Sequence, residues 1–177
     1  MRFLETAIPG VFVIELERIA DERGFFARSY CEREFGARGL HTRYPQCNVS
    51  YNARARTLRG MHWQAAPHAE VKLVRCTAGA VWDVAVDLRP GPTRLRWVGV
   101  ELSAAARNQI YIPEGCAHGF ITLTDDAEVF YQMGATYVAE AARGFRWEDP
   151  AVGIAWPAQP VVISDRDRAY PDLGGAP

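Results

Sequence analysis

The sequence lacks the features that mark secreted, membrane and metal-binding proteins. It has four cysteines, few for 177 residues and without metal-type spacing: Cys31, Cys47, Cys76 and Cys116. We therefore expect reduced thiols in a cytoplasmic protein. No apolar run approaches the roughly 18 residues that a membrane-spanning helix needs. The segment from Met1 to Glu5 also shows no long apolar region of the kind found in a signal peptide.

An excess of charge of either sign is also missing. Lys and Arg number 20, Asp and Glu number 21, and the formal net charge is −1. No broad electrostatic field therefore attracts nucleic acid or an acidic membrane, and we expect neither as a partner. A Gly-rich phosphate loop and a dinucleotide fingerprint are absent too, which disfavours a nicotinamide enzyme.

What is present indicates β structure. Hydrophobic residues make up 49% and aromatic residues 11% of the chain, and flat rings pack well on a pleated surface. Apolar runs of strand length recur, with Gly, Pro, Asn or Asp in most gaps, at 44–51, 57–64, 70–76, 80–88, 95–102, 108–112, 117–124 and 127–133. This spacing predicts a β-sandwich or barrel. The length suits one domain, which we expect to span 1–177.

The two ends of the chain are less regular. Residues 11–17 and 25–30 read as strands on either side of a polar turn at 21–24. Residues 31–38 are predicted to form a short helix closed by Gly39. After Pro157 the chain is rich in Pro and Asp, and we expect an irregular tail over the surface.

Strand alternation assigns side chains to faces, because neighbours in a strand point to opposite sides. Lys72 shares a row with Val74 and Cys76, and Tyr131 shares a row with Val129 and Met133. A lysine and a tyrosine on apolar rows are expected to point into the barrel interior.

The segment Leu58–Gln64 poses a geometric problem of its own. Strict alternation puts Arg59 and His62 on opposite faces of this strand. If both line one cavity, the strand must contain a bulge near Gly60, since glycine within a strand is where bulges occur.

His62, Lys72 and Tyr131 form a chemically meaningful combination. Each alone has an ordinary interpretation: a lysine can extend its charge to solvent, a histidine in a strand is usually structural, and a buried tyrosine usually packs. Together they supply a base, a cation and a weak acid. Such a set can remove a proton beside a carbonyl and return one from the other side.

The stretch Ile112–Phe120 contains Pro-x-Gly-x-x-His and is similar to the second half of the cupin signature. Metal-binding cupins add a His-x-His and a Glu from the first half, where this chain offers only His62. We therefore expect no metal site, and expect His118 to line the pocket. Arg23 and Arg59 each lie beside a glycine, which allows a guanidinium to approach a phosphate closely.

Eight motifs cover almost the whole chain: Asp-Glu-Arg-Gly-Phe-Phe (21–26), Gln-Cys-Asn-Val-Ser (46–50), Leu-Arg-Gly-Met-His-Trp-Gln (58–64), Lys-Leu-Val-Arg (72–75), Trp-Asp-Val-Ala-Val-Asp-Leu-Arg (82–89), Trp-Val-Gly-Val-Glu-Leu-Ser (97–103), Ile-Pro-Glu-Gly-Cys-Ala-His-Gly-Phe (112–120) and Arg-Gly-Phe-Arg-Trp-Glu-Asp-Pro (143–150). In this order the set resembles the dTDP-4-dehydrorhamnose 3,5-epimerase family of RmlC-like cupins. Each motif alone is weak, whereas the ordered set is highly specific.

The resemblance implies a mainly β, cupin-type jelly-roll β-barrel with a few short helices, a homodimer, and no metal or redox cofactor. It implies a nucleotide-linked 4-keto-6-deoxyhexose as substrate and inversion at C3, C5 or both through an enolate. By resemblance, His62 is the base and Asp167 its hydrogen-bond partner, Lys72 stabilises the enolate oxygen, and Tyr131 returns a proton to the opposite face. Diphosphate-binding positions match Arg23 and Arg59, and pocket-lining positions match Gln46, Asn48, His118 and Tyr137.

Five positions depart from the family pattern: Arg28, Cys47, Val49, Gln132 and Thr136. They leave open which nucleotide and sugar are bound, and whether one or two carbons are inverted. The alternatives are therefore a single-centre epimerase or ketoisomerase acting on another nucleotide sugar, a non-catalytic cupin that binds sugar nucleotides, and, more remotely, a metal-dependent oxygenase.

Overall fold

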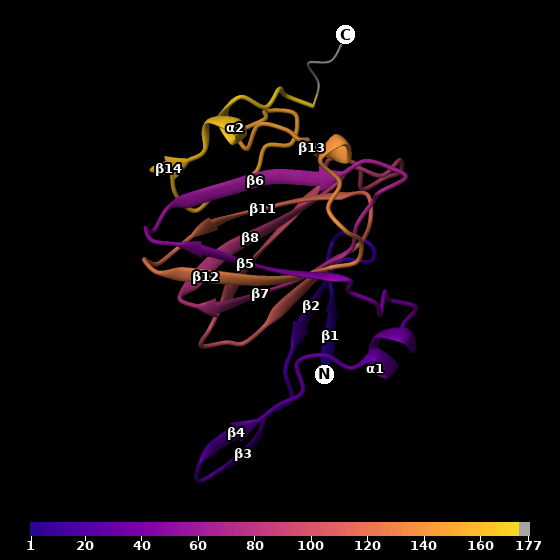
Figure 1. The fold of residues 1–177 in the computed structure, drawn as a ribbon, viewed down its shortest axis with the longest axis vertical. Coiled ribbons are helices and arrows are strands. Elements are labelled where there is room, and N and C mark those ends of the chain that lie inside the picture. Colours follow the sequence, from indigo (N-terminus) through magenta and orange to yellow (C-terminus); the bar gives the residue numbers. More distant parts are fainter. Residues whose placement is uncertain (174–177) are drawn as a thin grey trace.

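The computed structural model describes residues 1–173, which form mainly β structure with a few short helices (Figure 1). In chain order the elements are β1 (Arg2–Glu5), β2 (Phe12–Glu15), β3 (Ile19–Asp21), β4 (Gly24–Phe26), α1 (Glu32–Gly36), β5 (Gln46–Asn52), β6 (Thr57–Gln64), β7 (Lys72–Ala78), β8 (Ala80–Asp87), β9 (Trp97–Ser103), β10 (Gln109–Ile112), β11 (Cys116–Thr122), β12 (Ala127–Met133), the 3-10 helix η1 (Ala139–Ala141), β13 (Ala142–Gly144), β14 (Val162–Ile163) and α2 (Asp165–Arg168).

Two large sheets face each other. One has the strand order β1-β2-β10-β7-β12-β5, and the other has β13-β6-β11-β8-β9 with β14 added beside β6. In Figure 1 the layer of β5, β12 and β7 lies below the layer of β6, β11 and β8. This is the predicted jelly-roll barrel, and the two layers define the space in which a site can form.

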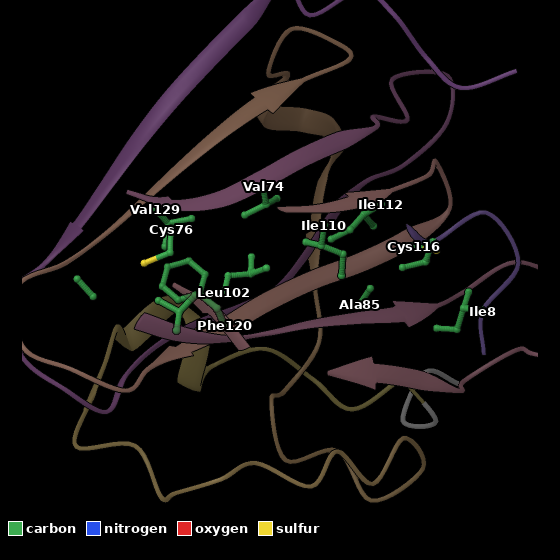
Figure 2. Packing of buried hydrophobic residues seen from close by; sticks show 13 residues of the cluster. Ile8, Val74, Cys76, Ala85, Leu102, Ile110, Ile112, Cys116, Phe120 and Val129 are labelled. Atoms are coloured by element: carbon green, nitrogen blue, oxygen red, sulfur yellow. The ribbon is translucent and has the colours of Figure 1, made fainter. Parts of the chain in front are cut away.

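The barrel interior is filled by the side chains that alternation assigned to it. Val74, Cys76 and Val129 belong to a buried cluster of 13 residues between the sheets (Figure 2). Leu73, on the other face of β7, packs instead in a separate cluster with Phe35 of α1. The predicted faces of β7 and β12 are therefore confirmed, and Lys72 and Tyr131 start from the interior side.

The predicted strands between residues 44 and 133 all form, with ends shifted by a few residues. Near the N-terminus the structure adds β1 and folds the segment around the predicted turn into the β3–β4 hairpin. The expectation of an irregular tail after Pro157 was wrong in part, because β14 and α2 lie there. β14 forms by pairing with β6, which is distant in sequence, and α2 places Asp167 against Gly60 of the same strand, so both carry little local signal.

The bulge expected near Gly60 is present. The register of β11 against β6 shifts between His118 and Phe120, so that β6 holds one extra residue. Gly60 has φ +138°, and a Cβ at this position would lie 2.6 Å from the Cα of Gly119. Only glycine allows so close an approach in this conformation, and the resulting bulge turns Arg59 and His62 toward the same side.

The β3–β4 hairpin projects away from the barrel (Figure 1). Its apolar side chains Ile19 and Phe26 are each 69% exposed. Two large apolar side chains on a projecting arm indicate a contact surface rather than a part of this chain's core. Among the described residues, no helix combines the length and apolarity needed to cross a membrane.

Candidate active site

A cavity of about 290 Å³ opens between the two sheets. It is lined by Arg59, His62, Lys72, His118, Phe120, Tyr131, Met133, Ser164, Arg166 and Asp167. A smaller hollow of about 180 Å³ adjoins it and shares four of these residues, His62, Tyr131, Met133 and Arg166. The structure thus brings most of the predicted site residues together around one space.

His62 is held by a carboxylate from the far end of the chain. Its Nε2 lies 2.7 Å from Oδ1 of Asp167, whose Oδ2 accepts a hydrogen bond of 3.2 Å from the amide of Gly60. The backbone N–H of Asp167 in turn donates to Oγ of Ser164, which caps α2. Burial opposes ionisation of Asp167, but the hydrogen bonds from His62, Gly60 and Ser164 outweigh it and lower the pKa of this carboxyl.

Lys72 lies at the start of β7, opposite Met133 of β12. Its side chain is 8% exposed, and Nζ lies 3.2 Å from the carbonyl oxygen of His62 and 3.2 Å from Oε1 of Glu70. A buried ammonium is tolerated when it is paired and hydrogen-bonded, and both conditions are met. The lysine therefore reaches across from one sheet to the backbone of the other, beside His62.

Tyr131 enters the cavity from β12, where it pairs with Asn48 of β5 and Val74 of β7. Burial is the main reason that the pKa of its phenol is raised. Glu70 adds to the rise and Arg59 opposes it. The phenol therefore keeps its proton at neutral pH and is suited to donate it.

A second histidine–carboxylate pair, which sequence reasoning missed, lies beside the first. His118 of β11 is the direct cross-strand partner of His62, and its Nε2 lies 2.9 Å from Oδ2 of Asp83. Asp83 is fully buried on β8. The sequence feature that could have revealed this pair is the single carboxylate of Asp83 inside the apolar run 81–86, because a buried carboxylate needs a partner.

The other predicted binding residues are arranged at the mouth of the cavity. Arg59 donates from Nε to Oδ1 of Asn52 at 2.8 Å, which directs its guanidinium. Gln46, Asn48 and Tyr137 line the adjoining hollow. Gln46 accepts from the Tyr137 amide at 3.1 Å and donates to Asn48 at 3.2 Å, so it also holds the rim in shape.

Within one chain, Arg23 is the predicted binding residue that does not reach the cavity. It lies at the tip of the exposed β3–β4 hairpin, where its guanidinium pairs with Asp21, and it is not among the residues that line the cavity. Arg166, by contrast, was not among the predicted site residues but lines both hollows, with Nε donating to the Tyr170 hydroxyl at 2.8 Å. The sequence feature that could have identified Arg166 as a site residue is its position next to Asp167.

The described part of the chain holds no group of three or more His, Cys, Asp and Glu side chains arranged to bind a metal ion. The side chains that meet in the cavity are instead a histidine backed by a carboxylate, a paired ammonium and a protonated phenol. A jelly-roll barrel with this cavity defines a cupin-class enzyme whose chemistry is proton transfer.

Comparison with known proteins narrows this class. The family model for dTDP-4-dehydrorhamnose 3,5-epimerase matches residues 5–174. The enzyme of that name from Shigella flexneri is 44% identical over 169 residues, which cover 94% of this chain and 93% of the relative. The chain therefore belongs to the dTDP-4-dehydrorhamnose 3,5-epimerase family, a family of isomerases.

Solved structures agree with this assignment. The Bacillus anthracis enzyme, with TDP and PPi bound, has a TM-score of 0.93 at 39% identity and covers 97% of this chain and 99% of its own. The Legionella pneumophila enzyme in complex with dTDP-4-keto-L-rhamnose has a TM-score of 0.90 at 36% identity, covering 97% of this chain and 92% of its own.

Proposed function

We propose that this protein inverts C3 and C5 of a dTDP-linked 4-keto-6-deoxyhexose by proton abstraction and return. One observation carries the proposal: His62 and Tyr131 reach the same cavity from opposite sheets of the barrel. Inversion needs a base on one face of the sugar and an acid on the other, and this arrangement supplies both. The bound ligands of the Bacillus and Legionella relatives support the substrate class.

The reaction starts at His62. Nε2 is engaged by Asp167, so Nδ1 is the nitrogen that takes a proton from the carbon beside the ketone. The electron pair of the broken C–H bond moves onto the ketone oxygen and forms an enolate. Asp167 stabilises the imidazolium that results, and Lys72 stabilises the enolate oxygen.

Tyr131 completes the inversion. Its phenol gives a proton to the opposite face of the same carbon, and the electron pair returns from oxygen to restore the ketone. The phenolate regains a proton from solvent while His62 releases one, so the reaction is balanced without a co-reactant. The same steps at the carbon on the other side of the ketone invert the second centre.

Binding is assigned to the mouth of the cavity. Arg59 and Arg166 are cations suited to hold a diphosphate. Gln46, Asn48 and Tyr137 line the adjoining hollow, and His118 lies beside His62 where it can contact the sugar. Together they orient the ketone between the base and the acid.

Arg23 fits this scheme in a homodimer. The hairpin that carries it projects from the barrel with Ile19 and Phe26 exposed, which suits contact with a second copy. We propose that each protomer lends Arg23 to the diphosphate site of its partner. We further propose that residues 1–177 form a single domain and that the protein acts in the cytoplasm, where its thiols stay reduced.

The function is tested with dTDP-4-keto-6-deoxyglucose in deuterated water. NMR should show deuterium entering at C3 and at C5, together with the inverted product. Exchange at one carbon alone would indicate a single-centre epimerase. Tight binding without exchange would indicate a non-catalytic protein, and both outcomes would contradict the proposal.

A further inference from the structure

Every nitrogen base or ammonium inside the cavity is backed by a buried carboxylate. His62 has Asp167, His118 has Asp83, and Lys72 has Glu70. The side chains of these three carboxylates are between 0% and 6% exposed. Exposed ion pairs contribute little, but a buried pair leaves an uncompensated charge when one partner is removed. Glu70 therefore stands to the ammonium of Lys72 as Asp167 stands to the imidazole of His62.

Glu70 lies in the loop that precedes β7, and both of its carboxylate oxygens are engaged. Oε1 lies 3.2 Å from Nζ of Lys72, and Oε2 accepts a 2.9 Å hydrogen bond from Nε2 of Gln64. Gln64 is itself fixed, because its Oε1 accepts a 2.6 Å bond from the amide of Val138. The carboxylate is therefore anchored to β6 and to the segment after β12, and it holds Lys72 from a fixed position.

The contacts of Lys72 fix the place of its ammonium. An ammonium has three N–H donors and no acceptor. One donor is hydrogen-bonded to the carbonyl oxygen of His62, and Oε1 of Glu70 lies 3.2 Å from Nζ as its ion-pair partner. With these two partners Nζ stays at one place in the cavity and keeps donors for the substrate, whereas a lysine without Glu70 would sample many rotamers.

We propose that Glu70 is the positioning residue of Lys72 and holds its ammonium where it can donate to the enolate oxygen. This inference rests on the proposed epimerase function and adds a residue to it. Glu70 borders the adjoining hollow, and in this scheme it acts on the reaction through Lys72 and not on the reacting atoms. The negative charge of Glu70 also favours the protonated phenol of Tyr131. Burial is the larger cause of the raised phenol pKa, and Arg59 opposes the rise. Glu70 therefore supports the acid Tyr131 as well as the cation Lys72.

A carboxylate is required at this position, and an amide of the same shape does not replace it. Gln64 donates a hydrogen bond to one oxygen of Glu70 and the ammonium of Lys72 pairs with the other, so residue 70 must present an oxygen to both. A glutamine has one acceptor oxygen and one donor group. In Glu70→Gln, one of the two neighbours would therefore face an N–H instead of an oxygen, and Lys72 would lose its fixed position or its counter-charge.

The test compares Glu70→Gln and Glu70→Asp with Glu101→Gln, a control on the exposed surface of β9. Inversion of dTDP-4-keto-6-deoxyglucose gives kcat and KM, deuterium incorporation at C3 and C5 gives the rate of enolate formation, and TDP binding and thermal unfolding check the site and the fold. We expect kcat of both Glu70 variants to fall about 10- to 100-fold with KM changed less than about twofold. Exchange should fall in parallel, since Lys72 acts on the enolate that both measurements share.

Three results would overturn the proposal while wild-type activity stands. The first is an unchanged kcat in a folded Glu70 variant, and the second is a loss that appears only in KM. The third is failure of both variants to fold, which would assign Glu70 to stability. Absence of exchange by the wild-type protein would instead overturn the proposed function, so the two failures are distinguishable.

Discussion

Nε2 of His62 lies 2.7 Å from Oδ1 of Asp167, although 105 positions separate the two residues in the chain. The final segment makes this contact possible. β14 pairs in parallel with the start of β6, and α2 then places Asp167 against the bulge at Gly60. A carboxylate in this position fixes the tautomer of the imidazole and stabilises its protonated form.

Replacement of Asp167 by Asn should keep the shape of this contact and remove its charge. We expect kcat to fall by about 10²- to 10⁴-fold, because the amide neither stabilises the imidazolium nor enforces the same tautomer. The matched control is Asp165→Asn, an exposed residue on the same helix. Steady-state kinetics on both variants make the comparison, and equal kcat values would refute the role of Asp167.

The pH dependence of inversion should reflect the phenol of Tyr131. Burial raises its pKa above the usual 10.0, and only the protonated phenol donates. A raised pKa means that the donating form persists through neutral pH and is lost only as the pH rises beyond 10. The tyrosinate absorption of wild type minus that of Tyr131→Phe reports this ionisation directly. Appearance of the Tyr131 phenolate below pH 10 would contradict the prediction.

Arg23 provides a test of the shared site. Arg23→Ala should lower kcat/KM by weakening diphosphate binding, and His62→Ala should abolish the chemistry. If each hairpin serves the partner's cavity, a mixed dimer of the two variants contains one site with both residues intact. Co-expression should then restore activity in about a quarter of all sites, since about half of randomly paired dimers are mixed. No restoration would count against the shared site, and a monomer by light scattering would count against the homodimer.

Much of the fold could be predicted because its signals are local. Strand-length apolar runs between turn residues indicated β5 to β12, and alternation placed Lys72 and Tyr131 on the interior face. Gly60 predicted a bulge because a regular strand cannot turn both Arg59 and His62 to one side. Each of these inferences needs only neighbours in sequence and the period of a strand.

The remaining parts of the site depend on contacts between distant segments. The roles of Asp83 and Glu70 could not be predicted from the sequence, because they depend on the folded structure that places these carboxylates beside His118 and Lys72. Asp167 was found by family resemblance, since nothing in the segment 164–168 alone predicts a contact with His62. The β3–β4 hairpin is a further example, because a single chain offers its Arg23 no cavity.

The central claim is that the two faces of the sugar are served by different residues, His62 on one side and Tyr131 on the other. The most direct test is Tyr131→Phe in deuterated water, with exchange and product stereochemistry followed by NMR on one sample. We predict that solvent deuterium still enters beside the ketone, because His62 remains, while inverted product falls sharply because no acid serves the opposite face. Inversion at the wild-type rate would contradict the account.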